Sequence, residues 1–215
     1  MPQSKTEPAV VTPSAAFNAR GLGWLYLVGG LVGLLCAGVL LVEKIELLKN
    51  PDYVPSCSIN PILSCGSVMV TPQADAFGIP NPLIGVAGFA ALAMLGAVLV
   101  SGTSLRAWLW VATQAAVTLA VVFIHWLIFQ SLYVIGALCP YCMVVWVVTI
   151  AVFWHTTIHN LRRHRGSVAS PARRGVAMLI EYRAAVLTAW YLVIIVLIAI
   201  RFWDYLVTLL LSVPR

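Results

Sequence analysis

The chain has 215 residues, of which 61% are hydrophobic and only 9% are charged, and its mean hydropathy is +0.96. Soluble domains carry about 25% charged residues, so this composition excludes an ordinary soluble protein and indicates a polytopic membrane protein. The formal net charge of +6 does not indicate nucleic-acid binding, because the basic residues cluster beside apolar segments, as topology signals do.

The chain opens with a polar segment, residues 1–20, which is rich in Pro, Ser and Ala and predicts a disordered tail rather than a cleaved signal peptide. A membrane-spanning helix needs about 20 mostly apolar residues. Five segments meet this requirement: Leu22–Val42, Leu83–Val100, Ala107–Tyr133, Val134–Ile158 and Ala184–Leu211. Only Tyr133–Leu138 is left as a turn between the third and fourth segments, which predicts a tight helical hairpin, with Gly136 and Pro140 allowing the reversal.

The positions of Lys and Arg predict the orientation in the membrane. Nine basic residues fall on one side: Lys5, Arg20, Arg106, Arg162, Arg163, Arg165, Arg173, Arg174 and Arg183. Four fall on the other: Lys44, Lys49, Arg201 and Arg215. We therefore expect a cytoplasmic N-terminus. The expected parts are a cytoplasmic tail (1–20), a four-helix bundle (21–158) with an extracytoplasmic loop (43–82), a basic cytoplasmic loop (159–183), and a fifth transmembrane helix with the C-terminus (184–215).

The most informative motif is Cys139-Pro140-Tyr141-Cys142 at the start of the fourth apolar segment. A C-x-x-C pair is a common unit of thiol–disulfide exchange. On a helix the two cysteines share one face, and a cysteine at the helix N-terminus has a lowered thiolate pKa. Cys142, one turn deeper, suits contact with a lipid-soluble oxidant. Half of a zinc site is the alternative; the four histidines are placed elsewhere, so no metal is expected.

A second pair, Cys57 and Cys65, lies in the polar loop after the first apolar segment. A disulfide between them would close a small loop. Spacing alone leaves a structural staple and a redox role equally open, and the C-x-x-C motif favours the redox role, because thiolate attack lets two pairs exchange when sulfur reaches sulfur. Cys36, in the middle of the first apolar segment, is expected to be an inert small hydrophobe.

These cysteine pairs, together with Ser67, Thr71 and the run Phe77-Gly78-Ile79-Pro80-Asn81-Pro82-Leu83-Ile84-Gly85, resemble the vitamin K epoxide reductase family over about Gly21–His155. The resemblance implies an all-α integral membrane protein, with a four-helix transmembrane bundle around a quinone. Many bacterial members add a fifth helix that leads to a fused thioredoxin-like domain. This sequence stops after the fifth helix, so a separate thioredoxin-fold (DsbA-like) oxidase is the expected partner.

The resemblance also implies the roles of the four cysteines. Cys142 would be the thiol beside the quinone, and Cys139 would be its partner that exchanges with the loop. Cys65 would be the loop cysteine that reaches Cys139, and Cys57 would meet the external partner.

Further residues carry implied contacts to the quinone. Asn81 matches a family Asn that bonds a quinone carbonyl, although Asn before Pro also suits a helix cap. Thr71 stands where many members have Ser. Trp146 stands where vertebrate members have Tyr, which weakens any inference about epoxide chemistry. Ser67 and Phe77 complete the candidate contacts; packing remains the alternative for Phe77, and an interfacial or core position for Trp146.

The expected function is a membrane quinone-dependent thiol:disulfide oxidoreductase of a bacterial cytoplasmic (inner) membrane. It would reoxidise an extracytoplasmic thioredoxin-fold oxidase, pass electrons to menaquinone or ubiquinone, and so support disulfide formation in exported proteins. One alternative is a quinone or vitamin K epoxide reductase of lipid-quinone metabolism. A carrier of cytoplasmic reductant would need paired cysteines on the cytoplasmic side. A transporter would predict intramembrane charges or broken helices in repeated halves.

Overall fold

A computed structural model describes residues 13–164, 170–205 and 207. Within these residues, five helices are long and apolar enough to cross a membrane: Ala19–Lys49, Asn81–Val100, Ala107–Ile135, Pro140–Arg163 and Arg183–Arg201. The expected all-α membrane fold is therefore confirmed.

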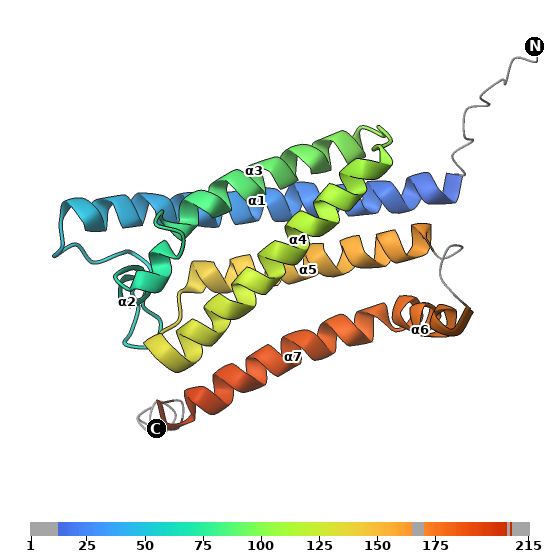
Figure 1. Ribbon diagram of the computed structural model, residues 1–215. Helices are drawn as coiled ribbons and strands as arrows, with labels where there is room; N and C mark the ends of the chain where they lie inside the picture. The colour runs from blue at the N-terminus through green and yellow to red at the C-terminus, as the bar shows by residue number, and fades with distance from the viewer. Residues whose placement is uncertain (1–12, 165–169, 206, 208–215) are drawn as a thin grey trace, which may run out of the picture.

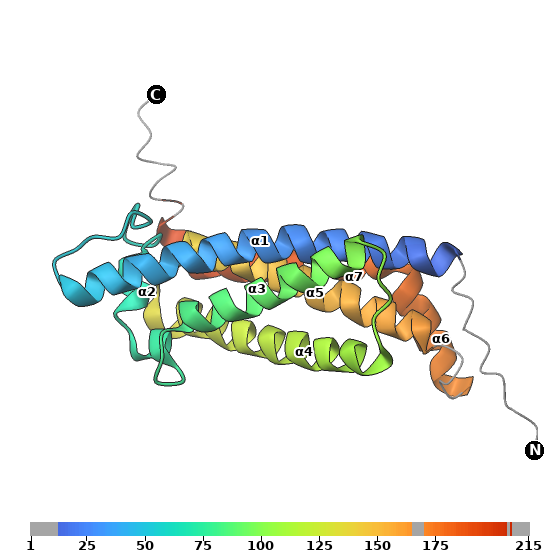
Figure 2. The same cartoon turned by 90° about the horizontal axis from the view of Figure 1, so that it is seen from above.

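Four long helices form the bundle, short helical segments connect them, and α6 and the long helix α7 follow (Figure 1). The bundle consists of α1 (Pro13–Lys49), α3 (Asn81–Val100), α4 (Ala107–Phe129) and α5 (Pro140–Arg163). The remaining helices are α2 (Cys65–Met69), the 3-10 helix η1 (Pro72–Asp75), the π-helical segment η2 (Gln130–Ile135), α6 (Ser170–Glu181) and α7 (Arg183–Arg201). Figures 1 and 2 show α2, the start of α5 and the end of α7 gathered at one end of the bundle.

Several predicted boundaries were wrong. The first helix begins at Pro13, inside the tail expected to be disordered, and continues to Lys49 rather than ending at Val42. The third span continues through η2 to Ile135 rather than ending at Tyr133, and the fourth helix begins at Pro140, within the apolar segment Val134–Ile158 and after the predicted turn. Gly136 then takes a left-handed φ of +72°, a conformation that ends helices and that glycine adopts without strain. The fifth helix ends at Arg201, and residues 206 and 208–211 of the predicted span lie outside the described residues.

Helices α1 and α3 pack through small residues. A Cβ on Gly30 would lie 2.6 Å from the backbone nitrogen of Ala93, and a Cβ on Gly96 would collide with the backbone nitrogen of Leu27. Glycines at such positions let two membrane helices approach closely. This contact fixes α1, whose C-terminal end carries the anchors of the cysteine loop, against α3.

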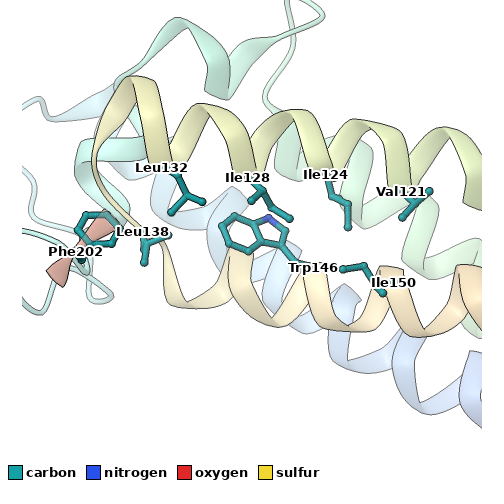
Figure 3. Close-up of a cluster of buried hydrophobic side chains, with 8 residues drawn as sticks. All are labelled: Val121, Ile124, Ile128, Leu132, Leu138, Trp146, Ile150 and Phe202. Atoms are coloured by element: carbon teal, nitrogen blue, oxygen red, sulfur yellow. The ribbon is translucent and has the colours of Figure 1, made fainter. Parts of the chain in front are cut away.

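A buried apolar cluster joins α4, η2 and α5 (Figure 3). It contains Val121, Ile124, Ile128, Leu132, Leu138, Trp146, Ile150 and Phe202. The indole of Trp146 lies between the two helices in Figure 3, so the cluster fixes the first turns of α5, which carry the C-x-x-C motif. Helix α7 has no fully buried residue between Arg183 and Arg201, but its partly buried hydrophobic side chains pack against this cluster. Two polar contacts add to this packing: Trp190 Nε1 donates to His125 Nε2 (3.0 Å), and Arg201 Nε donates to the carbonyl oxygen of Leu132 (2.7 Å).

Candidate redox site

The loop between α1 and α3 holds Cys57 and Cys65 in a disulfide, with their Cα atoms 5.6 Å apart. Cys65 is the first residue of α2, and Ser64 caps that helix by accepting a hydrogen bond from the Ser67 backbone N–H (3.2 Å). Both cysteines are buried, with exposed fractions of 5% for Cys57 and 0% for Cys65. The loop pair is therefore enclosed by protein even though it lies outside the helical spans.

A short backbone ladder places this loop against the start of α5. The Ser64 N–H donates to the Leu138 carbonyl (2.9 Å), and the Leu138 N–H donates to the Ile62 carbonyl (2.7 Å). These bonds form a parallel bridge between Leu63 and Leu138. Cys139 directly follows Leu138, and Cys65 lies two residues after Leu63. The bridge therefore brings the two sulfur atoms to a distance of 3.2 Å.

Cys139 is the N-cap residue of α5, as the C-x-x-C motif predicted for a helix start, and Pro140 occupies the first turn. The Cys139 sulfur accepts a hydrogen bond from the Cys142 backbone N–H (3.4 Å). The pKa of the Cys139 thiol is lowered, chiefly because the Cys142 thiol donates to it and with help from the backbone N–H groups of Cys142 and Tyr141, while burial opposes the shift. A thiolate at Cys139 can therefore form next to the Cys65 sulfur.

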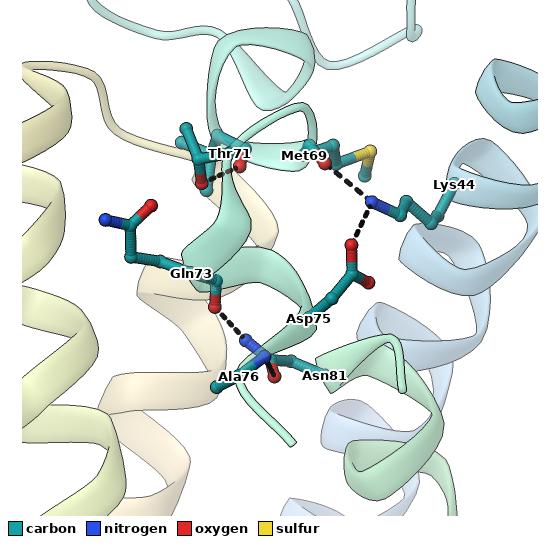
Figure 4. Close-up of polar contacts among 8 residues, drawn as sticks. Lys44, Met69, Thr71, Gln73, Asp75, Ala76 and Asn81 are labelled. Atoms are coloured by element: carbon teal, nitrogen blue, oxygen red, sulfur yellow. Dashed lines mark hydrogen bonds and ion pairs between the residues drawn. The ribbon is translucent and has the colours of Figure 1, made fainter. Parts of the chain in front are cut away.

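Two adjacent charged residues near the C-terminal end of α1 anchor the loop, and both are buried. Lys44 Nζ donates to the carbonyl oxygen of Met69 (2.7 Å) and forms an ion pair with Asp75 Oδ2 (2.9 Å), as Figure 4 shows. These contacts fix the end of α2 and the η1 segment. Lys44 entered the sequence argument only as a topology signal, and its structural role was missed.

Glu43 holds the other arm of the loop. Its carboxylate accepts a hydrogen bond from the Tyr53 hydroxyl (2.8 Å) and further bonds from the backbone and side chain of Ser56. Ser56 directly precedes Cys57. Glu43 and Lys44 together thus attach the segments on both sides of the loop disulfide to one turn of α1.

A cavity of about 770 Å³ lies between the four bundle helices and the loop. Its lining is largely apolar, which suits a hydrophobic ring held by a few polar groups. The predicted site residues that line it are Cys65, Thr71, Phe77, Asn81, Cys139, Cys142 and Trp146. The structure therefore places the C-x-x-C motif and most of the predicted quinone contacts around one space.

Asn81 does not cap α3. The N-cap residue is Pro80, and the Asn81 side chain instead holds the η1 segment. Asn81 Nδ2 donates to the Gln73 carbonyl (2.7 Å), and Oδ1 accepts from the Ala76 N–H (3.2 Å), as Figure 4 shows. An amide nitrogen carries two hydrogens, and the bond to the Gln73 carbonyl uses one of those of Asn81.

Ser67 does not line the cavity, contrary to the prediction. It is exposed, and its hydroxyl lies 2.8 Å from that of Ser64. Residues two apart on a helix point to different faces. Because Cys65 lies on the buried face of α2, Ser67 points outward.

Two other predicted contacts, Thr71 and Phe77, do line the cavity. The Thr71 hydroxyl donates to the Val68 carbonyl (2.7 Å). The Phe77 ring lies 5.3 Å from that of Phe123, centroid to centroid, and is 67% exposed.

The sequence argument also missed Gln130, which lines the cavity from the start of η2. Its Oε1 atom is buried and has no hydrogen-bond partner among the described residues. The only sign in the sequence is that Gln130 is a polar residue near the end of an apolar span. Many such residues simply lie at the membrane surface, so this sign does not identify a site.

Three sulfur atoms, those of Cys57, Cys65 and Cys139, lie within 4.8 Å of one another. Metal ions bind cysteine as the thiolate, and two of these sulfurs share a disulfide in this structure. The arrangement present is that of thiol–disulfide exchange, with one free thiol next to a disulfide.

This combination of two touching cysteine pairs and an apolar cavity inside a helical bundle defines a membrane thiol oxidoreductase. The family model described as the Vitamin K epoxide reductase family matches residues 24–157, and the chain belongs to this family. The matched segment contains both cysteine pairs and the cavity. The protein is therefore a multi-pass membrane oxidoreductase of a family linked to quinones or vitamin K. None of the curated proteins compared with the chain matches it.

Proposed function

We propose that the protein oxidises the dithiol of an extracytoplasmic thioredoxin-fold protein and transfers the electrons to a membrane quinone. The observation that carries this proposal is the 3.2 Å contact between the sulfurs of Cys65 and Cys139. Cys142, one turn further along α5, lines the apolar cavity. Sulfur atoms thus form a path from the loop to the place where a quinone ring fits.

The first exchange takes place in the loop. The partner's dithiol reduces the Cys57–Cys65 disulfide and leaves as a disulfide, which gives two loop thiols. Cys57 is 5% exposed, so the partner must displace part of the loop to reach its sulfur. Attack at Cys57 releases Cys65, the cysteine that already touches Cys139.

The second exchange connects the two pairs. The Cys65 thiolate attacks Cys139 of a Cys139–Cys142 disulfide, forms a Cys65–Cys139 bond and releases Cys142 as a thiolate. Cys57 then attacks Cys65, which restores the loop disulfide and frees Cys139. The product has an oxidised loop pair and two thiols on α5, which is the redox state of this structure.

A quinone in the cavity would take up the two electrons and two protons of the α5 dithiol and leave as hydroquinone. The chain's part is to place the Cys142 sulfur at the cavity, to hold Cys139 close enough to close the disulfide again, and to offer the second amide N–H of Asn81 to a ring oxygen. The apolar lining keeps water away from the ring. Trp146, Thr71 and Phe77 shape this space.

The Lys and Arg distribution supports an outward-facing loop in a bacterial cytoplasmic membrane, where disulfides persist on the outer side. A membrane-impermeant thiol reagent, added to intact cells after reduction, should label Cys57 and Cys65 and spare Cys36. Labelling that requires the cytoplasmic side to be opened would contradict this orientation and the role in oxidising exported proteins.

A reconstituted assay tests the function. The purified protein in lipid vesicles is given a reduced thioredoxin-fold oxidase together with menaquinone, ubiquinone or vitamin K epoxide, and partner thiols and quinone are both followed. We expect one hydroquinone per partner disulfide formed with menaquinone or ubiquinone. Turnover with the epoxide alone would favour the alternative of an epoxide reductase. Quinone reduction without partner oxidation would remove the partner from the proposal.

A further inference from the structure

Within the described residues, Gln130 Oε1 is the buried side-chain oxygen of the cavity lining that has no hydrogen-bond partner. The side chains of Gln73 and Ser131 also line the cavity without a hydrogen bond among the described residues, but neither has a buried polar atom of this kind. The remaining hydroxyl, amide and ammonium side chains of the lining are hydrogen-bonded within the protein. The hydroxyl groups of three threonines donate to backbone carbonyls within their own segments, and they belong to Thr71, Thr113 and Thr149. The Asn81 amide holds the η1 segment at both of its polar atoms. Gln130 Oε1 is buried without a partner.

A buried amide oxygen without a hydrogen bond destabilises the folded protein, and such groups call for a reason. The backbone at Gln130 is also unusual, because η2 is a π-helical segment in which the Gly136 N–H bonds the Ser131 carbonyl five residues earlier (3.0 Å). Segments of this kind are frequent at functional sites, where they change the direction of side chains. Gln130, the first residue of η2, lines the cavity together with Cys142 and Asn81, each from a different helix.

We propose that Gln130 binds a ring oxygen of the quinone and of its hydroquinone, which makes it a second polar contact besides Asn81. This inference rests on the proposed function. A quinone carbonyl only accepts hydrogen bonds, whereas the hydroxyl formed when the ring gains an electron pair and two protons also donates. The unpartnered atom of Gln130 is an acceptor, so Oε1 accepts from the hydroquinone hydroxyl, and Nε2 donates to the same oxygen while it is a carbonyl.

The test uses the full-length protein with dithiothreitol as the reductant, a short-chain menaquinone as the substrate, and the matching hydroquinone as a product inhibitor. Gln130→Leu removes the amide at similar size. Net protein hydrogen bonds are worth about 0.5–1.5 kcal/mol, which corresponds to a change of roughly twofold to twelvefold. We expect Gln130→Leu to raise both the KM for the quinone and the inhibition constant of the hydroquinone by this factor, per folded molecule.

The matched control is Gln114→Leu in the same helix. The Gln114 side chain bonds Thr157 and Asn160 rather than lining the cavity. We expect it to lower the melting temperature and to leave both constants unchanged. Gln130→Leu should instead leave the melting temperature of the ligand-free protein unchanged or raise it, because an unsatisfied buried oxygen is removed.

Unchanged constants in folded Gln130→Leu protein would overturn the proposal, as would equal shifts in the two variants. A fall in melting temperature with unchanged constants would show a structural role instead. If Gln130→Leu does not fold, Gln130→Met supplies the same measurements with an unbranched side chain. Failure of the proposed function would look different, because folded wild-type protein would then not reduce the quinone at all.

Discussion

The two cysteine pairs touch each other but are held in place by different means. Cys139 and Cys142 are separated by one helical turn, and the helix cap and the apolar cluster around Trp146 fix their positions. Cys57 and Cys65 lie in a segment with little regular structure, whose position depends on polar contacts with Glu43 and Lys44 and on the backbone bridge to Leu138.

This difference matches the tasks that we propose for the two pairs. A pair that delivers electrons to a buried ring needs one fixed geometry, and a helix supplies it. A pair that must meet both an external protein and the α5 pair needs to change position. Polar anchors on a loop allow such a change, because water can replace each hydrogen bond when the segment moves outward. Regions that move in function are generally those of low local stability.

The largest expected effect comes from breaking the helix pair. In Cys142→Ser, the Cys139 thiolate attacks Cys65 of the loop disulfide, forms a Cys65–Cys139 bond and releases Cys57. Because Cys142 cannot resolve this bond from α5, only the return attack by Cys57 opposes its accumulation. We expect loss of quinone reduction and accumulation of this mixed disulfide, detected by mass mapping without reduction. Cys36→Ser is the control and should turn over normally. A trapped Cys57–Cys139 bond would reverse our assignment of the two loop cysteines.

Asn81 holds the η1 segment and also lines the cavity. A substitution at Asn81 can therefore separate a structural role in the loop from a role in quinone reduction. Loss of a donor that stabilises developing charge typically slows a reaction about 100- to 1000-fold. Asn81→Asp keeps the oxygen that accepts from Ala76 but removes the N–H donors. We expect quinone reduction to slow strongly while dithiol exchange at Cys57–Cys65 continues, with the two half-reactions measured separately per folded protein. An equal fall in both half-reactions would show that Asn81 serves only to hold η1.

Lys44 tests the polar anchoring of the loop pair. Hydrogen bonds to charged groups contribute about 1.5–3 kcal/mol each when buried, and the partial exposure of Asp75 (38%) reduces this value through solvent screening. Lys44→Met should therefore lower the free energy of unfolding by about 1–2 kcal/mol and slow exchange between Cys65 and Cys139. Lys49→Met, which removes an exposed ion pair with Glu46, is the control and should alter neither quantity measurably.

The smallest expected effect is a shift along the pH axis. The attack of Cys139 on the loop disulfide requires the Cys139 thiolate, so the rate of this attack should rise with pH through the lowered pKa of that thiol and level off below the range of an ordinary cysteine. In Cys142→Ala the thiol that donates to Cys139 is absent, which removes the main cause of the lowering. The pH midpoint for forming the Cys65–Cys139 bond should then be higher in Cys142→Ala than in Cys142→Ser, whose hydroxyl can still donate. Identical midpoints would contradict this cause.

The sequence by itself predicted the membrane class, the approximate positions of the spans, the helix start at Cys139 and the residues able to carry redox chemistry. These features depend on local composition and spacing: a run of apolar residues must span lipid, and Pro140 after Cys139 favours a first helical turn. The helix ends were less predictable. The extension of α1 to Lys49 depends on loop partners for Glu43 and Lys44, and the π-helical segment before Gly136 has no local signature.

Only the tertiary structure decided which sulfurs meet. Cys65 and Cys139 are 74 residues apart, and the backbone bridge between Leu63 and Leu138 that unites them depends on the packing of the whole bundle. The same holds for Ser67, which α2 turns outward, and for Gln130, which becomes a candidate ligand only because its oxygen is buried in a cavity. Contacts between distant segments follow from how all helices pack together, and no single stretch of sequence contains that information.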